Sequence, residues 1–193
     1  MKRLTLHIKG MICPRCETVI RQEMQQLDAN VVAIKPGYAL VEVPGAVDLA
    51  LIDKKLHRHG FELLKDPEQR LVEQIKTTTL AYLDRQQDAT LRVNLPTLSD
   101  FLMQTIGRNY SHLSKLFSKH EGKTLEQYYI HLRIEQVKEL LDYQELNISE
   151  IADKLGYSSG HYLSAQFKKV TGRSISEYRK DTDTMNRNYL NEL

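Results

Sequence analysis

Apolar residues at helical spacing repeat themselves in the second half of this chain, at an offset of fifty positions. The segment 113–128 returns as 163–178, with leucine, phenylalanine, glycine and tyrosine at corresponding places. Each copy predicts a helix that ends at a glycine, followed by a new helix whose capping box begins at Thr124 or at Ser174. A fixed offset over this length indicates one supersecondary unit used twice. The pattern therefore predicts an all-α double helix-turn-helix region, a framework that many DNA-binding proteins use.

Each copy places small polar and basic side chains opposite its apolar stripe. Leu113 and Phe117 point inward in the first copy, and Leu163 and Phe167 do so in the second. The opposite face is the one that enters the major groove of DNA in this architecture. The side chains expected to contact base edges are Ser111, Ser114, Lys115, His161, Tyr162 and Ser164. Those expected to contact phosphates are Lys119, Lys168, Lys169 and Arg173.

The motifs of residues 68–180 resemble the DNA-binding domain of the AraC/XylS family of bacterial transcription regulators. The residues that carry the resemblance are Ile151-Ala152, Leu155-Gly156-Tyr157-Ser158, Phe167-Lys168, Gly172-x-Ser174, Tyr178-Arg179 and a connecting helix over 124–141. The resemblance implies sequence-specific binding of double-stranded DNA. Ala165 occupies a position where this family often has a long polar side chain that contacts a base. The second helix-turn-helix (the second reader) is therefore expected to make fewer direct contacts with bases.

Residues 1–66 follow a different pattern, in which segments with the two-residue period of a strand alternate with segments that have helical spacing. Leu4, Leu6 and Ile8 alternate with polar neighbours and predict a half-buried strand. Amphipathic helices are expected from Pro14 and over 47–59, and further strands over 31–34, 38–43 and 61–64. The resulting order, βαββαβ, predicts an α+β, ferredoxin-like domain.

Cys13 and Cys16 stand where the first strand leads into the first helix. Two thiols three positions apart at a helix start can point at one ion, and both the helix N-terminus and Arg15 favour the thiolate form. Paired thiolates without a nearby carboxylate suit a soft monovalent ion. His59, at the end of the second helix, is a candidate third ligand, although a histidine that caps a helix C-terminus also explains it.

The same region resembles the heavy-metal-associated domain of copper chaperones and metal-transporting ATPases. The resemblance covers residues 2–66 and rests on Gly10-Met11-Ile12-Cys13-Pro14-Arg15-Cys16 and on Gly60-Phe61. It implies that Cys13 and Cys16 bind a soft metal ion. Ile12 stands where zinc-selective relatives often carry an acidic residue, so the resemblance favours Cu(I).

Other interpretations of the front domain stay open. A lone Cys-x-x-Cys motif also occurs as a redox pair, and it can persist as scaffold after metal binding is lost. The domain can then be a protein-docking or redox module that contacts a metallochaperone or a second copy of the chain. A third interpretation is a metal-buffering protein with vestigial DNA binding.

The length of the chain and the position of a proline predict the domain boundaries. The 193 residues suffice for two small domains, and Asp66-Pro67 marks the boundary between residues 1–66 and 67–181, with a polar tail over 182–193. The formal net charge of +2 is too small to identify a DNA-binding protein by itself. The expected phosphate contacts therefore depend on basic residues that cluster near the two recognition helices.

The sequence also predicts where the protein resides and what it does not do. No apolar run approaches the length of a membrane span, and Met1–Leu4 lead into a strand rather than a signal peptide. Two cysteines this close are no disulfide scaffold, which favours the cytoplasm. No nucleophile–base pair, glycine-rich phosphate loop or paired-carboxylate site is present, so no enzyme activity is expected. We expect a one-component regulator in which a metal-binding front domain controls a DNA reader.

Overall fold

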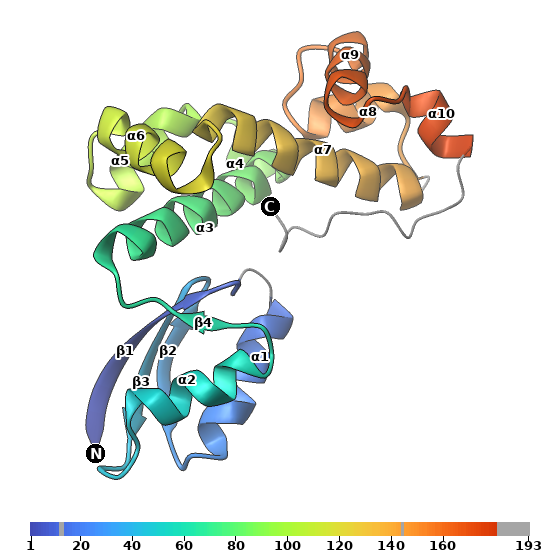
Figure 1. Ribbon diagram of the computed structural model, residues 1–193. Helices are drawn as coiled ribbons and strands as arrows, with labels where there is room; N and C mark the ends of the chain where they lie inside the picture. The colour runs from blue at the N-terminus through green and yellow to red at the C-terminus, as the bar shows by residue number, and fades with distance from the viewer. Residues whose placement is uncertain (12–13, 144, 181–193) are drawn as a thin grey trace. The chain divides into compact units, whose positions relative to one another are not determined.

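The computed structural model describes residues 1–11, 14–143 and 145–180, and the chain divides into two compact units, Met1–Thr77 and Thr78–Leu193 (Figure 1). The first unit extends beyond the predicted boundary at Asp66-Pro67, because the first half of a long helix packs with it. The polar tail expected over 182–193 lies outside the described residues. Within the described ranges, no helix has both the length and the apolar character that crossing a membrane requires.

The first unit is a four-stranded antiparallel sheet with two helices on one face. Its elements are β1 (Lys2–Lys9), α1 (Pro14–Gln25), β2 (Asn30–Lys35), β3 (Tyr38–Val43), α2 (Leu49–His57) and β4 (Glu62–Leu63). They follow one another in the order expected from the sequence. The strands lie in the order β2-β3-β1-β4, so the first strand of the chain is central and pairs with both β3 and β4.

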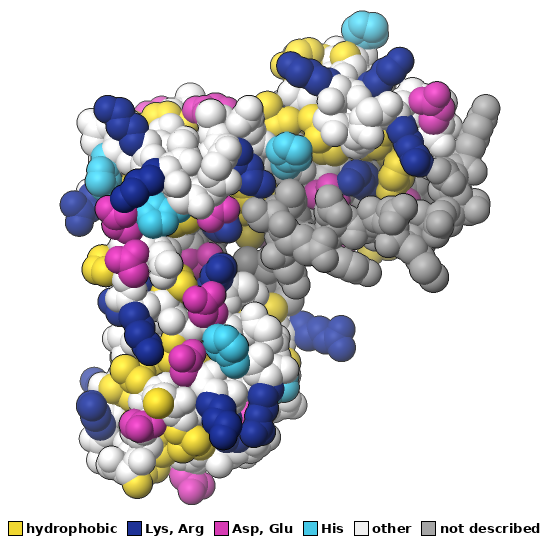
Figure 2. Space-filling model, in the orientation of Figure 1, with side chains coloured by type: hydrophobic (Ala, Val, Ile, Leu, Met, Phe, Trp, Pro, Cys, Tyr) yellow, Lys and Arg dark blue, Asp and Glu magenta, His cyan; other side chains and the backbone are white. Residues whose placement is uncertain are grey.

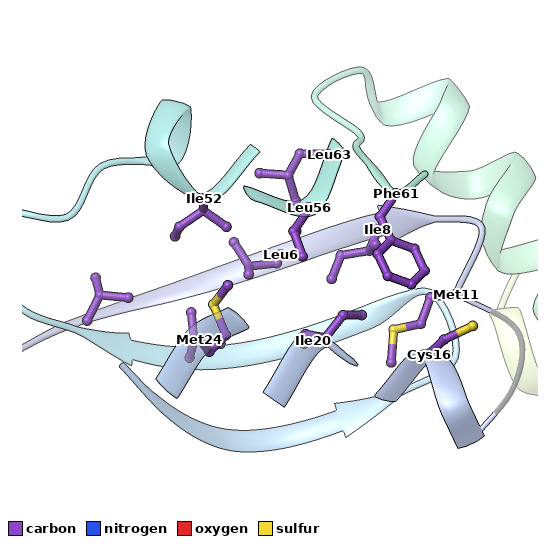
Figure 3. Close-up of a cluster of buried hydrophobic side chains, with 13 residues drawn as sticks. Leu6, Ile8, Met11, Cys16, Ile20, Met24, Ile52, Leu56, Phe61 and Leu63 are labelled. Atoms are coloured by element: carbon purple, nitrogen blue, oxygen red, sulfur yellow. The ribbon is translucent and has the colours of Figure 1, made fainter. Parts of the chain in front are cut away.

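The core of the first unit lies between this sheet and the two helices. Alternation along β1 sends Leu6 and Ile8 toward the helices, and helical spacing brings Ile20 from α1 and Leu56 from α2 to meet them (Figure 3). All four side chains are at most 1% exposed. Met11, Phe61 and Cys16 lie together at one end of this core, so the buried thiol belongs to the packed interior (Figure 3).

The second unit is built of helices. Helix α3 (Pro67–Gln87) begins in the first unit and ends in the second, where α4 (Ala89–Arg92), α5 (Leu98–Ile106), α6 (Tyr110–Glu121), α7 (Leu125–Tyr143), α8 (Ile148–Lys154), α9 (Gly160–Thr171) and α10 (Ile175–Lys180) follow. Helices α5 and α6 pack as one pair, and α8 and α9 as another. Helix α7 connects the pairs and contacts both α6 and α9.

The sequence repeat is confirmed as a structural repeat. Helices α6 and α9 both end at a glycine in the left-handed conformation, with φ of 67° at Gly122 and 76° at Gly172. After each glycine, a residue with a hydroxyl side chain and one with a carboxyl or amide side chain cap the next helix reciprocally, as predicted. Each copy also pairs a buried phenylalanine with a tyrosine. The ring centroids are 5.2 Å apart for Phe117 and Tyr128 and 5.5 Å apart for Phe167 and Tyr178.

Candidate nucleic-acid interface and thiol site

Helix α6 presents the first set of predicted base-contacting side chains. Asn109 caps its start by accepting a hydrogen bond from the Ser111 backbone N–H at 2.8 Å. The apolar stripe is buried, whereas Ser111 and Lys115 are exposed and Ser114 is half-buried. Lys119, predicted to contact phosphate, is also exposed. The helix therefore keeps a polar face with one cation at its centre available to a partner.

Helix α9 presents the second set in a corresponding way. Ser159 caps its start by accepting a hydrogen bond from the Tyr162 backbone N–H at 3.1 Å. His161 is exposed, and the Tyr162 side chain is 53% exposed. The Ser164 hydroxyl donates to the Gly160 carbonyl oxygen at 2.8 Å, which leaves only its lone pairs for a base. The cationic side chains predicted to contact phosphates are exposed here too: Lys168, Lys169 and Arg173.

The two faces differ at one central position. Lys115 of α6 corresponds to Ala165 of α9 at the repeat offset, and both are exposed. An alanine methyl group can contact a thymine methyl group but cannot donate a hydrogen bond to a base. In the view of Figure 2, Lys and Arg side chains are visible on the surface of both helix pairs. The α6 face thus carries a hydrogen-bond donor at this position, whereas the α9 face carries a methyl group.

One exposed side chain on this surface was missed by the sequence analysis. His112 of α6 is exposed and lies at the position that Tyr162 occupies in α9. The repeat offset could have identified it, because a predicted base-contacting position in one copy implies the same position in the other. Its ring nitrogens can donate to or accept from base edges.

The end of α3 and the middle of α7 hold the turn between α8 and α9. The Arg133 guanidinium lies over the Tyr157 ring at 3.5 Å from its centroid. The Tyr129 hydroxyl donates to Gln86 Oε1, and the Gln86 amide lies where a Cβ on Gly156 would be. Burial raises the pKa of Tyr129 to about 12, so its hydroxyl stays a donor at neutral pH.

A second contact fixes helix α8 itself. Arg92 of α4 donates to the Asp153 carbonyl oxygen at 2.6 Å and to its carboxylate at 3.1 Å. Asp153 lies near the C-terminal end of α8, where a cation also interacts favourably with the exposed carbonyl groups. The second helix-turn-helix is thus positioned by side chains from three other helices of the same unit.

The candidate metal site lies at the start of α1. Cys16 is in the first turn, is 8% exposed, and its sulfur lies 3.8 Å from the Gly10 carbonyl oxygen. Cys13 lies outside the described residues. Within the described part of the chain, no three His, Cys, Asp or Glu side chains group together as a metal site. A buried thiol at a helix N-terminus, with a second cysteine three positions earlier, has the donor chemistry that a soft ion prefers.

The structure places His59 in another contact. Its Nε2 lies 3.0 Å from Glu23 Oε1, and Lys55 Nζ lies 3.1 Å from the other oxygen of the same carboxylate. The hydrogen bond from His59, together with the nearby Lys55 ammonium, holds the pKa of Glu23 below its usual value. Glu23 lies about two helical turns beyond Cys16 along α1. His59 thus joins the segment after α2 to α1 in this structure.

Comparisons with known proteins concern mainly the second unit. A family described as a helix-turn-helix domain matches residues 102–181. The Msm operon regulatory protein of Streptococcus mutans is 27% identical over 117 residues, which are 57% of this chain and 40% of that protein. The uncharacterized HTH-type transcriptional regulator YidL of Escherichia coli is 29% identical over 119 residues, which are 62% of this chain and 37% of that protein.

A solved structure is similar as well. A crystal structure of a transcriptional regulator described by AraC-type DNA-binding domains, from Chromobacterium violaceum, aligns with 58% of this chain and 95% of its own, at 20% identity and a TM-score of 0.48. This chain spans about two fifths of the length of the two curated relatives. The residues that the helix-turn-helix family matches begin in α5 and end after α10, so they include both helix pairs.

Proposed function

We propose, from the match of residues 102–181 to a helix-turn-helix domain family, that this chain is a DNA-binding transcription regulator of the AraC type. The structural repeat carries this proposal. Two helix pairs share the same caps, the same left-handed glycines and the same Phe–Tyr contact, and each leaves a polar helix face exposed. The curated relatives that align with this region bear the names of operon and transcription regulators. A regulatory rather than an enzymatic role follows.

The binding geometry follows from the two exposed faces. Helices α6 and α9 are proposed to enter successive major grooves on one side of double-stranded DNA, about 34 Å apart. The proposed base-contacting set is Ser111, Ser114 and Lys115 with His161, Tyr162 and Ser164, and the exposed His112 is proposed as a further member. The phosphate-contacting set is Lys119, Lys168, Lys169 and Arg173.

Replacing Lys115 by alanine is expected to relax base preference at one position of the binding site. Lys115 is exposed at the centre of the α6 face and can donate to O6 and N7 of guanine. The loss should be about 1–3 kcal/mol on a duplex selected from a random-sequence pool, and small on random DNA. Fluorescence anisotropy with both duplexes measures this difference.

The matched control for this prediction is Lys119→Ala, one turn further along α6. It should weaken selected and random DNA alike, and should flatten the dependence of log K on log salt by about one unit. An equal loss for both duplexes in the Lys115→Ala protein would show that Lys115 contacts phosphate and not a base.

For the first unit, we propose a ferredoxin-like, heavy-metal-associated domain that binds a soft ion, with Cu(I) favoured, through Cys13 and Cys16. Its support is the element order, the strand order and the buried Cys16 thiol at the start of α1. When bound, the ion would supply a link between the two sulfurs that fixes the loop. Two thiolates leave Cu(I) two-coordinate, so a second copy of the chain or a metallochaperone is a possible source of a further ligand.

A second candidate function keeps the DNA reader and makes the first unit a protein-docking or redox module. The buried position of Cys16 and its contact with Gly10 are also what a thiol with a packing role, and no metal ion, would show. Titration of the reduced protein with Cu(I) and with Zn(II), followed by mass spectrometry, separates the two candidates. Metal sensing requires a metal complex that is lost when both cysteines are replaced.

Replacing Cys13 and Cys16 together by serine is expected to keep the fold and the basal DNA affinity but to remove any response to Cu(I). Linkage requires metal and DNA to change each other's affinity by the same factor, and such coupling is typically about 1–3 kcal/mol. DNA affinity measured across a Cu(I) titration tests this. Identical titration curves for the double variant and the wild-type protein would end the sensor hypothesis.

A further inference from the structure

We propose that Arg133 is a positioning residue for DNA recognition, which holds the exposed ring of Tyr162 in place through the buried ring of Tyr157. The inference deepens the proposed function and rests on it, because Tyr162 is one of the side chains proposed to contact bases. Arg133 lies in α7 and belongs to neither the proposed base-contacting set nor the phosphate-contacting set. All three residues lie in the second compact unit.

Direct contacts connect the three side chains. The Arg133 Cζ atom lies 3.5 Å from the centroid of the Tyr157 ring, which places the guanidinium group in van der Waals contact with that ring. The centroids of the Tyr157 and Tyr162 rings are 6.2 Å apart, a separation at which aromatic rings still attract each other. Tyr157 is 6% exposed and Tyr162 is 53% exposed, so the contacts lead from the core of this unit to the face proposed to meet DNA.

Tyrosine rings provide the described electrostatic contacts of the Arg133 guanidinium group. A second ring, that of Tyr129 one turn earlier in α7, has its centroid 5.4 Å from Arg133 Cζ, and its hydroxyl donates to Gln86 Oε1. In the described part of the chain, neither Nε nor Nη2 of Arg133 has a hydrogen-bond partner. A flat, delocalised cation stacks on such rings, whereas the compact ammonium group of a lysine cannot lie flat against them. The arrangement therefore depends on arginine at this position.

Few side chains on the proposed DNA-binding face of α9 can donate a hydrogen bond to a base. Ala165 ends in a methyl group, and the Ser164 hydroxyl already donates to the Gly160 carbonyl oxygen at 2.8 Å. His161 and Tyr162 remain as the donors of the proposed base-contacting set in α9. A ring that is already held in place loses less entropy when a partner binds. Holding Tyr162 therefore strengthens base contacts on a helix in which Ala165 contributes no donor.

The first helix-turn-helix has a different residue at the corresponding place. Gly107 corresponds to Gly156 in the repeat, so Arg108 corresponds to Tyr157. Arg108 is exposed, whereas Tyr157 is buried and stacks with Arg133. A substitution of Arg133 is therefore expected to alter α9 and to leave the face of α6 unchanged.

The test is a double-mutant cycle on the full-length protein, in which fluorescence anisotropy measures affinity for a duplex selected from a random-sequence pool. Arg133→Met keeps a long side chain but removes the flat cation. It should weaken binding about fivefold, the penalty of ordering one loose side chain on binding. Tyr162→Ala should weaken binding at least as much, and the double variant should lie within about twofold of the weaker single variant. Losses that multiply would show that Arg133 does not act through Tyr162, and would overturn the proposal.

Three further variants separate the stack from the charge. Arg133→Lys keeps the charge but not the flat group, so it should recover little of the lost affinity, and full recovery would contradict the stacking role. Tyr157→Phe is the conservative variant, because the Tyr157 hydroxyl has no hydrogen-bond partner among the described residues, and it should stay within about twofold of wild type. Lys115→Ala is the matched control in the other helix pair, and its loss should multiply with that of Arg133→Met.

Nuclear magnetic resonance of protein with labelled tyrosine rings tests the positioning without DNA. A nuclear Overhauser effect between the Tyr157 and Tyr162 rings is expected in the wild-type protein and should weaken in Arg133→Met. Thermal unfolding checks that each variant is folded, and Arg133→Lys keeps the test decisive if Arg133→Met is unstable. An unchanged contact between the rings in the folded variants would overturn the proposal. If the wild-type protein selects no duplex from the pool, the proposed function fails, and the ring contact still shows whether Arg133 positions Tyr162.

Discussion

Replacing Phe167 by alanine is expected to destabilise the second helix-turn-helix by about 3–5 kcal/mol, the largest effect of any single substitution considered for this chain. The Phe167 ring is fully buried and packs at 5.5 Å from the Tyr178 ring. Its removal leaves a cavity between α9 and α10 that the short α10 cannot close. Hydrogen exchange followed by mass spectrometry should show faster exchange in α8, α9 and α10.

Two further variants serve as comparisons for the loss of stability in Phe167→Ala. Phe117→Ala should cost a similar amount in the first helix-turn-helix, because Phe117 is equally buried and packs against Tyr128. Lys169→Ala, on the exposed face of α9, should change stability by no more than about 0.5 kcal/mol while it weakens DNA binding. A loss below about 1 kcal/mol for Phe167→Ala would mean that the ring is not part of a packed core.

Gly156→Ala is expected to cost about 2–3 kcal/mol in the same unit, from two separate causes. The φ of Gly156 is +68°, a left-handed conformation that alanine adopts only at a cost. An added Cβ would also collide with the Gln86 side chain, which would have to give up the hydrogen bond from Tyr129. Urea unfolding monitored by circular dichroism measures the total loss.

Gly172→Ala is the matched control, since Gly172 has a φ of +76° and no atom within 4 Å of its Cβ position. It should show the conformational cost of about 1 kcal/mol alone. Combining Gly156→Ala with Gln86→Ala should cost less than the sum of the two single changes, because the collision is then absent. Strict additivity would show that Gln86 does not occupy the space beside Gly156.

Much of the second unit could be predicted because its signals are local. The capping box at Thr124 and the one at Ser174 involve residues three positions apart, so a short window of sequence contains the whole interaction. The left-handed glycine at the end of each reader helix is likewise visible in the sequence itself. The repeat then reinforced each assignment, since every feature occurred twice at the same offset.

The front unit could be predicted in its elements but not in how its cysteine motif is held. Alternation and helical spacing gave the order of strands and helices close to the observed limits. The same reasoning made His59 a candidate metal ligand because its loop follows the second helix. Its ring nitrogen contacts Glu23, a residue thirty-six positions away, and periodicity did not predict this contact. Periodicity indicates on which face of a helix or strand a residue lies, but not which distant residue its side chain contacts.

Sequence alone thus determined which segments are helices and strands, where the helices of the two readers begin and end, and which of their side chains stay exposed. Those properties depend on hydrophobic periodicity and capping within a few residues. Only the tertiary structure decided that Glu73 binds Gly10, sixty-three positions away, and that Gln86 fills the space beside Gly156. Glu73 and Gln86 look like ordinary polar residues of an amphipathic helix, and only the packing of distant segments buries one and gives each its partner.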